Sequence, residues 1–460
     1  HVYYVDFKPK VFDARIGVAD DAGDPTWRTI LICGFNMGGT HIWAEGDFND
    51  GNGVTTRHFY PSYVCMDITD PLNPRLLWER TYTELGMTRA TPAVIRIENV
   101  SGAGDWYAVF GSGPTDYDGS STQNGYVFVV DLKTGEPIRP SGASSWQFDT
   151  GVANTYMNSP ASLDKDLTNS VDAIYFGDAA GNLYHISTRE PPDPGDPAAP
   201  RSPSAEPSNW TITKIFSGPR PITAAVGLSV DALDDVWVYF GTGSYLTEAD
   251  KTNADQQYIF GIRDPLFKQS PSALPLSIGN LFNSDAYTVY TNRNVDGGLA
   301  RIYDWYSLLN VVRNTEDQGA YPDYFDGWYR SLESTDPSAR VITEPAVLGG
   351  GIYLPAFTPN ADVCGFGGDS NFYALYYETG TAYFNPLLPN GTTDVAGQDY
   401  KIVKVKVPLG EGMPPPAVGI HAGRQKGAKA FLQMSTGEVV EMDIETPLNI
   451  KSGLTTWRTN

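Results

Sequence analysis

Basic residues are scarce in this sequence, and long apolar runs are absent. Its 460 residues include 32 Lys and Arg against 54 Asp and Glu, so the formal net charge is −22. Recognition of nucleic-acid phosphates needs clustered Lys and Arg, which argues against a nucleic-acid partner. No apolar run approaches the roughly 18 residues of a transmembrane helix, so we expect no membrane span. The composition fits a secreted or cell-surface protein with calcium in its surroundings.

Cysteine is also rare, with three residues in the chain. Cys33 and Cys65 lie in successive strand-like segments, and neighbouring strands would permit a disulfide, as in proteins of oxidising compartments. Two buried free thiols are the alternative. Cys364 is left over in both cases, so the sequence alone leaves the state of all three cysteines open.

Signals for catalysis are few. The sequence has no Gly-x-Ser-x-Gly nucleophile elbow and no phosphate-binding loop. Its histidines are scattered and lack the spacing of a metal-binding cluster, and a single His on a strand is more often structural than catalytic. We therefore expect a protein that is not an enzyme. The five histidines are His1, His41, His58, His185 and His421.

What the sequence does contain is a repeated pair of short strands. An apolar strand, a Gly-containing turn, a second strand and an acidic residue recur at intervals of roughly 65 to 80 residues, with one longer gap. A four-stranded sheet cannot bury both faces by itself, and radial packing of such sheets in a β-propeller solves this. We predict an all-β fold, a modified β-propeller of about seven blades (six to eight), formed by residues 1–460 as one domain. The copies begin near Thr29, Trp106, Ile174, Val236, Gly351 and Ala430.

Long insertions interrupt the repeats. Residues 190–208 are rich in proline, which favours an extended or disordered surface loop. Residues 296–312 carry apolar side chains at helical spacing and predict one inserted helix, either a loop decoration or a cap on the central opening of the ring. The longer gap, between Gly261 and Ile352, leaves room for a further blade. Ring closure would pair residues 2–5 with residues 454–457.

The most informative stretch is residues 164–172. Oxygen-bearing side chains stand at every second position, and alternate residues of an extended segment point the same way. Two short strands joined by a Gly/Asn turn follow directly. Calcium prefers carboxylate, hydroxyl and carbonyl oxygens and tolerates irregular shells better than magnesium does. The pattern therefore predicts a calcium loop with the ligands Asp164, Asp166, Thr168, Ser170 and Asp172.

A solvated turn is the alternative interpretation of this loop, because Asp is common in turns. The loop departs from an EF-hand, since Tyr175 stands at the twelfth position, where a bidentate Glu belongs. Asn169 replaces Gly at the sixth position, and Asn enters the left-handed backbone region more readily than most residues. A second polar loop, residues 45–53, has glycines out of register for a regular calcium loop.

Several motifs recur in order along nearly the whole chain. In these motifs the chain resembles the PilC/PilY family of tip-associated biogenesis factors and adhesins of bacterial type IV pili. Each motif is weak alone, and their order makes chance similarity an inadequate explanation. They occupy residues 27–31, 38–39, 67–71, 221–225, 239–246, 327–329, 344–350 and 362–368.

The resemblance implies a modified β-propeller on the outer surface, usually preceded by an N-terminal region. This sequence starts at His1 with neither an initiator Met nor a signal peptide, so we expect a processed product or the C-terminal part of a longer protein. The family also implies a calcium loop in one blade with oxygen ligands at alternating positions, as in residues 164–172. Thr168 and Ser170 stand where acidic or amide side chains would bind more strongly, so we expect weaker affinity.

The resemblance further implies a function. Calcium occupancy in the family is thought to govern pilus extension and retraction and contact of the tip with surfaces. The implied partners are pilin or minor pilins at the pilus tip and a host or abiotic surface. The implied location is extracellular, on the bacterial cell surface or the pilus.

An enzyme class offers the alternative. Pyrroloquinoline quinone dehydrogenases are also propellers, with repeats that end in Asp-x-x-Thr-Gly and a following Trp. Residues 131–135 with Trp146 resemble one such repeat, and residues 378–380 resemble a remnant. Many of those enzymes carry adjacent cysteines beside the cofactor, and this sequence has none. Thr-Gly turns also close strands in propellers generally, so the fold by itself does not indicate an enzyme.

Overall fold

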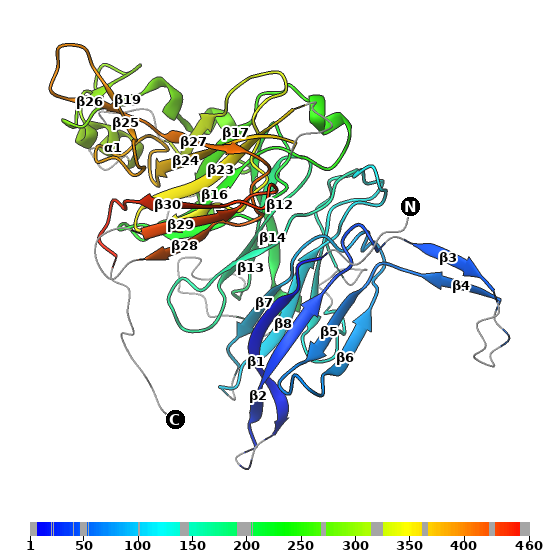
Figure 1. Cartoon of the computed structure of the whole chain (residues 1–460). Coiled ribbons are helices and arrows are strands. Elements are labelled where there is room, and N and C mark those ends of the chain that lie inside the picture. Colours follow the sequence, from blue (N-terminus) through cyan, green and yellow to red (C-terminus); the bar gives the residue numbers. More distant parts are fainter. Residues whose placement is uncertain are drawn as a thin grey trace. The chain divides into compact units, whose positions relative to one another are not determined.

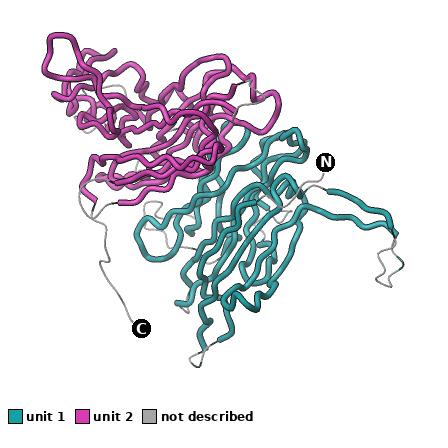
Figure 2. Tube along the Cα trace, in the orientation of Figure 1, with its two compact units in different colours: residues 1–214 teal, residues 215–460 magenta. Residues whose placement is uncertain are grey.

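In the residues that it describes, a computed structural model of the chain is all-β with one α-helix, which confirms the predicted fold class (Figure 1). None of the described helices is long and apolar enough to cross a membrane. The chain divides into two compact units, residues 1–214 and 215–460 (Figure 2). The structure describes residues 7–450 except 20, 22, 40, 47–52, 54, 100–101, 139–146, 191–203, 205, 268–272, 314–324, 361–366 and 423–427.

The first unit is built around three four-stranded sheets. The first sheet contains β1 (Lys10–Ala19), β2 (Pro25–Cys33), β5 (Tyr63–Asp67) and β6 (Arg75–Arg80). The second contains β10 (Phe148–Asp149), β9 (Tyr126–Asp131), β8 (Asp105–Gly111) and β7 (Ala93–Ile97). The third contains β11 (Ala161–Leu163), β12 (Ala173–Gly177), β13 (Asn182–Ser187) and β14 (Thr211–Ser217), whose last three residues belong to the range of the second unit. A separate hairpin pairs β3 (Ile42–Glu45) with β4 (Thr56–Phe59).

The second unit has three further sheets of three to five strands. The five-stranded sheet contains β15 (Gly227–Val230), β16 (Val236–Gly241), β17 (Tyr258–Arg263), β21 (Gly327–Ser331) and β18 (Phe282–Asn283). The four-stranded sheet contains β22 (Ala346–Leu348), β23 (Gly351–Pro359), β24 (Gly368–Tyr376) and β27 (Lys406–Glu411). The last contains β28 (Gly419–Ala422), β29 (Ala428–Gln433) and β30 (Val439–Ile444).

The remaining elements are short. Two hairpins pair β19 (Thr288–Val289) with β20 (Val295–Asp296), and β25 (Thr392–Asp394) with β26 (Lys401–Val403). The α-helix is α1 (Trp305–Arg313). The 3-10 helices are Pro207–Asn209, Ala249–Thr252, Pro265–Phe267, Ile278–Asn280 and Ser284–Ala286.

Alternation along the central strands explains how the sheets pack. In β8, Tyr107 and Val109 point to one face, where they join a buried cluster with Ile174 of the third sheet. The intervening Ala108 and Phe110 point to the other face and pack with the first sheet. Successive strand residues point to opposite faces, so a strand that is apolar throughout is buried between two neighbouring sheets. This is the face-to-face packing that the repeats predict.

The helix begins later than predicted. Residues 295–296 pair with Thr288–Val289 as strand β20, and Gly297 and Gly298, which are poor helix formers, follow. Asp304 caps the helix, because its carboxylate accepts a hydrogen bond from the Ser307 amide at 2.8 Å. The predicted start at Asp296 was therefore wrong, although Ile302 is buried beside the helix in the same core.

The long gap between Gly261 and Ile352 holds no further sheet of three or more strands of its own within the described residues. Its strands β18 and β21 extend the five-stranded sheet, and β19 and β20 form a hairpin. The described part of the chain thus contains six sheets of three to five strands, the lower end of the expected six to eight blades. The ring-closing segments, Cys364, residues 47–52 of the second polar loop and most of the Pro-rich insertion lie outside the described residues.

Cys33 and Cys65 are free thiols on adjacent strands. Cys65 stands opposite Ile32, whereas Cys33 stands opposite Val64. Because neighbouring residues of a strand point to opposite faces, the two sulfur atoms lie on opposite sides of the sheet. Of the two alternatives that the sequence left open, the structure has the free thiols, although Cys65 is buried and Cys33 is only half-buried.

Candidate metal centre

The predicted calcium loop connects β11 to β12. Leu163 and Ala173, which pair with each other, flank the loop. The Asp172 amide closes the loop by donating to the Leu163 carbonyl oxygen at 2.7 Å. Asn169 adopts the left-handed conformation expected of it, with φ 63°. Leu167 does the same with φ 57°, and its side chain is 83% exposed. The left-handed turns fold the nine loop residues back on themselves, so that residues from both ends approach one another.

Three of the predicted ligands come together in this loop. One carboxylate oxygen each of Asp164, Asp166 and Asp172 lies within 4.8 Å of the others. Ca–O distances of 2.3–2.6 Å allow two ligand atoms of one ion to be at most about 5.2 Å apart. The three oxygens are hard donors at a spacing that one calcium ion spans. The chemistry and spacing of these three oxygens are therefore compatible with calcium.

Hydrogen bonds within the loop hold two of these carboxylates in place. The Asp164 carboxylate accepts hydrogen bonds from the Thr168 amide at 3.0 Å and the Asn169 amide at 2.7 Å. The Thr168 hydroxyl donates to Asp166 at 2.8 Å, so this predicted ligand lies beside the carboxylates. The hydrogen bond from Thr168, aided by the nearby Arg189 charge, lowers the pKa of Asp166 below its ordinary value. Asp166 is thus readily ionised, as a calcium ligand must be.

Ser170 makes its contact elsewhere. Its fully buried hydroxyl oxygen accepts a hydrogen bond of 3.0 Å from the Glu98 amide, just beyond β7. Next to it, the Val171 amide donates to the Arg96 carbonyl oxygen at 3.0 Å, and the Arg96 guanidinium donates to the Asn169 carbonyl oxygen at 2.8 Å. These bonds tie the loop to the second sheet. In this arrangement Ser170 anchors the loop, and the carboxylates are its strongest candidate ligands.

Asp172 is fully buried and has a cationic partner. One of its oxygens accepts from Nε and Nη2 of Arg189 at 2.9 and 2.6 Å, and the other accepts from the Lys165 amide at 2.8 Å. Nη2 of Arg189 also lies 3.5 Å from Asp166. Burial raises the pKa of Asp172 above its ordinary value, although the Lys165 amide and Arg189 act in the opposite direction. Arg189 therefore offsets part of the negative charge of the loop.

Sequence reasoning missed Arg189. It lies 17 residues beyond Asp172, after strands β12 and β13, which pair in register from Ala173↔Ser187 to Gly177↔Leu183. The hairpin returns the chain to the start of β12, so residues shortly after β13 meet residues shortly before β12. Extending the hairpin register by a few residues would have brought Arg189 to the loop.

The Thr-Gly turn that suggested a quinone enzyme has a structural role. The Asp131 side chain accepts from the amides of Lys133 and Thr134 and from the Thr134 hydroxyl, at 3.1, 2.8 and 2.7 Å. Gly135 follows with φ 69° against the ring of Trp78. This turn closes β9 and seats a tryptophan of the neighbouring sheet. Trp146, the other part of that motif, lies outside the described residues.

Comparison with known families assigns the chain. A family model described as the PilY1 β-propeller domain matches residues 1–283. The chain belongs to the PilY1 β-propeller domain family. This confirms the predicted family and the predicted propeller. Two similar proteins are a type IV pilus biogenesis factor PilY1 homologue of Xylella fastidiosa, 26% identical over 405 residues, and the type IV pilus biogenesis factor PilY1 of Pseudomonas aeruginosa PAO1, 27% identical over 409 residues.

Each alignment covers 83% of this chain, but only 23% of the Xylella protein and 31% of the Pseudomonas protein. The chain therefore spans about a quarter to a third of the length of these PilY1 relatives. The crystal structure of the Pseudomonas aeruginosa PilY1 C-terminal domain has the same fold, with a TM-score of 0.64 and 20% identity, over 96% of this chain and 84% of that one. That residues 1–460 form one domain, the C-terminal part of a longer protein, stays a prediction.

Proposed function

We propose that this chain is a non-enzymatic, calcium-binding part of a type IV pilus-associated protein. Its role is in pilus biogenesis, in control of extension and retraction, and in adhesion of the bacterium to surfaces. Membership of the PilY1 β-propeller domain family supports the link to the pilus. The observation that carries the calcium site is the convergence of Asp164, Asp166 and Asp172 within 4.8 Å.

The proposed location and partners follow from the same family. The chain acts outside the cell, on the bacterial surface or the pilus. It contacts pilin or minor pilins at the pilus tip on one side and a host or abiotic surface on the other. Nothing in this role requires a nucleic acid or a membrane span, and the net charge of −22 disfavours the former.

The proposed mechanism is linkage between calcium and the order of the loop. Calcium would join both ends of the loop, since Asp164 and Asp166 come from its start and Asp172 from its end. The hydrogen bond from the Glu98 amide to Ser170 and that from the Val171 amide to Arg96 would pass this order to the neighbouring sheet. A ligand shifts an equilibrium only by binding one state better than the other. The calcium-bound loop is the state that favours contact with the pilus or a surface.

Thermal unfolding in EDTA and in graded calcium tests the site. A ligand that binds only the folded state raises the melting temperature by an amount set by RT ln(1 + [L]/Kd). We expect a calcium-dependent rise in the wild type that is lost in Asp172→Ala and in Asp166→Ala. Magnesium at equal concentration should give a smaller rise. No rise at millimolar calcium would reduce the loop to a solvated turn.

A matched control for Asp166→Ala exists on β5. The Asp67 carboxylate accepts from the Thr69 hydroxyl at 2.6 Å and lies 3.8 Å from Arg28, as Asp166 does with Thr168 and Arg189. Asp67→Ala should change the melting temperature in EDTA while leaving the calcium-dependent rise intact. A second experiment is done in cells. It compares pilus number and surface attachment among three strains in which the chromosomal gene encodes the wild type, Asp172→Ala or Asp67→Ala. Equal attachment of the three strains would show that calcium binding by this loop is not needed for the role in attachment.

A further inference from the structure

His41 and His58, which are 17 residues apart in the sequence, meet at the β3–β4 hairpin. Figure 1 shows this hairpin. Nε2 of His41 lies 3.0 Å from Nδ1 of His58, and both side chains are exposed. Their rings stack with centroids 5.3 Å apart and an interplanar angle of 17°. The scattered spacing of the histidines in the sequence gave no sign of this contact.

The strand register explains the meeting. In the hairpin Trp43 stands opposite His58. His41 is two residues before Trp43, so it lies on the same face of the hairpin and diagonal to His58. Diagonal neighbours are about 7–8 Å apart at the backbone, within reach of ring side chains. The Tyr60 ring stacks on the His41 ring, with centroids 4.6 Å apart and an interplanar angle of 7°. These contacts hold the two imidazoles in one orientation.

We propose that His41 and His58 form a binding site for a first-row transition-metal dication such as Ni²⁺, Cu²⁺ or Zn²⁺. Imidazole nitrogen suits these ions, whereas calcium takes oxygen ligands, so this site and the carboxylate loop select different metals. With metal–nitrogen distances of about 2.0–2.1 Å, two ligands of one ion are separated by about 2.9 Å at a right angle and about 3.4 Å in a tetrahedron. The 3.0 Å between the two nitrogens falls within this range.

The two histidines supply two ligands, and water or a donor from a partner completes the shell. In the metal-free pair the two nitrogens form a hydrogen bond, and a bound metal ion would replace this bond. A two-stranded hairpin is only marginally stable by itself. A metal that bridges the residue before β3 to a residue within β4 would staple the two strands. Metal binding would therefore stabilise the hairpin against opening.

Isothermal titration with Ni²⁺ and Zn²⁺ tests this proposal. The chain is used without a purification tag, on a His1→Ala background so that the first histidine adds no ligand, and in millimolar calcium to occupy the carboxylate loop. We expect one saturable site at neutral pH, with affinity at least tenfold lower in His41→Ala and in His58→Ala. Affinity should also fall as the pH is lowered, because a protonated imidazole cannot bind a metal.

His421 on β28 supplies the matched control, since it is another exposed strand histidine. His421→Ala should bind as the wild type does. Hydrogen exchange of the hairpin amides gives a second measurement: added Ni²⁺ should slow exchange in the wild type and in His421→Ala only. Equal metal affinity in the wild type and the His41→Ala/His58→Ala double variant would overturn the proposal, as would the absence of any saturable site. Circular dichroism and melting temperature would verify that each variant is folded.

Discussion

The indole Nε1–H of Trp78 donates a hydrogen bond of 2.9 Å to the carbonyl oxygen of Leu132 in the neighbouring sheet. Trp78 lies in β6 of the first sheet, and Leu132 begins the turn after β9 of the second. The ring also covers Gly135, where an added Cβ would lie 2.7 Å from Cδ2 of Trp78. One tryptophan therefore joins two sheets through both a polar and a close apolar contact.

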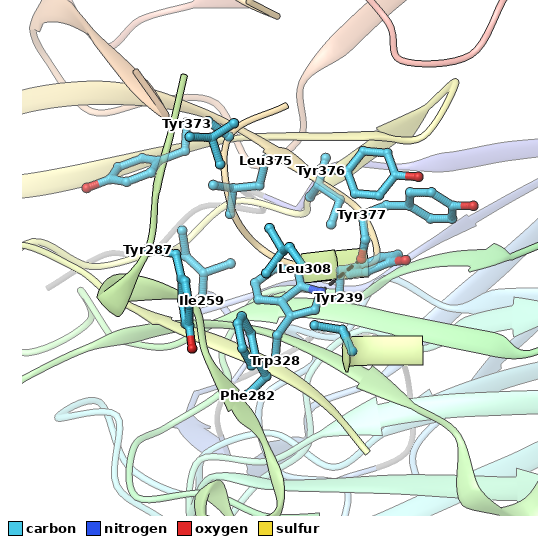
Figure 3. Packing of buried hydrophobic residues seen from close by; sticks show 14 of the residues in the cluster. Tyr239, Ile259, Phe282, Tyr287, Leu308, Trp328, Tyr373, Leu375, Tyr376 and Tyr377 are labelled. Atoms are coloured by element: carbon cyan, nitrogen blue, oxygen red, sulfur yellow. Dashed lines mark hydrogen bonds between the residues drawn. The ribbon is translucent and has the colours of Figure 1, made fainter. Parts of the chain in front are cut away.

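The same arrangement recurs in the second unit. Trp328 of β21 donates to the carbonyl oxygen of Tyr377 at 2.9 Å (Figure 3). Three residues after Tyr377, Gly380 has φ 66° and would place an added Cβ 2.2 Å from the indole. In each copy the glycine stands three residues after the carbonyl that accepts the bond. The repeat of this geometry explains both Thr-Gly turns without a quinone cofactor.

Gly135→Ala should destabilise the protein by more than the cost of placing an alanine in a left-handed backbone conformation. The backbone at φ 69° costs an alanine roughly 1–2 kcal/mol. The contact with Trp78 adds overpacking, typically about 1–3 kcal/mol. Gly151→Ala is the matched control, because Gly151 has φ 70° and nothing within 4 Å of an added Cβ. Urea unfolding of both variants measures the difference in unfolding free energy. Equal losses in the two variants would show that the indole of Trp78 moves aside without an energetic cost.

Arg189→Gln should have opposite effects with and without calcium. In EDTA it leaves the buried Asp172 carboxylate without its cation. Breaking a buried pair typically costs about 3–5 kcal/mol, and we expect about 2 kcal/mol because Asp172 keeps the hydrogen bond from the Lys165 amide. In calcium, removal of a competing positive charge should increase affinity several-fold.

Thermal unfolding across a calcium titration measures both effects of Arg189→Gln. Arg80→Gln is its control, since the Arg80–Glu136 pair is exposed on both sides and exposed pairs contribute at most about 1 kcal/mol. The control should show little change in either condition. Weaker calcium binding in Arg189→Gln would mean that Arg189 positions the carboxylates for the metal.

Much of this structure could be predicted from the sequence, because the decisive signals are local. The paired strands that begin near Thr29 and recur as far as Ala430 contain apolar runs, and the predicted oxygen ligands of the loop lie within nine residues. Asn169 adopts its predicted left-handed backbone conformation because this preference belongs to the residue type and does not depend on distant contacts. Contacts between distant segments carried no such signal. Arg189 and the pair His41 and His58 are brought to their partners only by strand register.

The start of the helix shows a different limit. Residues 296–312 have apolar side chains at helical spacing, yet Asp296 belongs to a strand. Ile302 is buried because the loop before the helix packs against the same core as the helix. Burial therefore produced the spacing, and the capping residue Asp304, not the spacing, marks where the helix begins.

Cys65 should resist alkylation in the folded protein. Burial raises the pKa of its thiol to about 12, so the reactive thiolate is on the order of one part in 10⁴ at pH 8. Iodoacetamide followed by peptide mass mapping should find Cys65 unmodified in the native chain and modified in urea. The same mapping without reductant should find no peptide joining Cys33 to Cys65. A cross-linked peptide would contradict the free thiols.

Asp178→Asn should change how stability depends on pH. Burial raises the pKa of this carboxyl above its ordinary value, despite hydrogen bonds from Asn182 and Tyr184. Folding therefore disfavours its charged form. Below the ordinary pKa of about 3.9 both states are protonated and no penalty exists. As pH rises through the pKa of the folded state, the penalty develops in full. The free energy of unfolding of the wild type therefore falls with rising pH because of this residue.

The Asn side chain cannot ionise, so the stability of Asp178→Asn relative to wild type should increase between pH 4 and pH 7. Any fixed loss from altered hydrogen bonds to Asn182 and Tyr184 does not affect this slope. Asp70→Asn is the control of opposite sign: the hydrogen bond from Asn73 lowers the pKa of exposed Asp70. Its charge stabilises the folded state above the ordinary pKa, and this stabilisation is lost as pH falls through the folded pKa. This variant should therefore lose stability relative to wild type as pH rises to about 5, and the difference should stay constant from there to pH 7. Urea unfolding at several pH values measures both slopes, and parallel curves for Asp178→Asn and wild type would contradict the raised pKa.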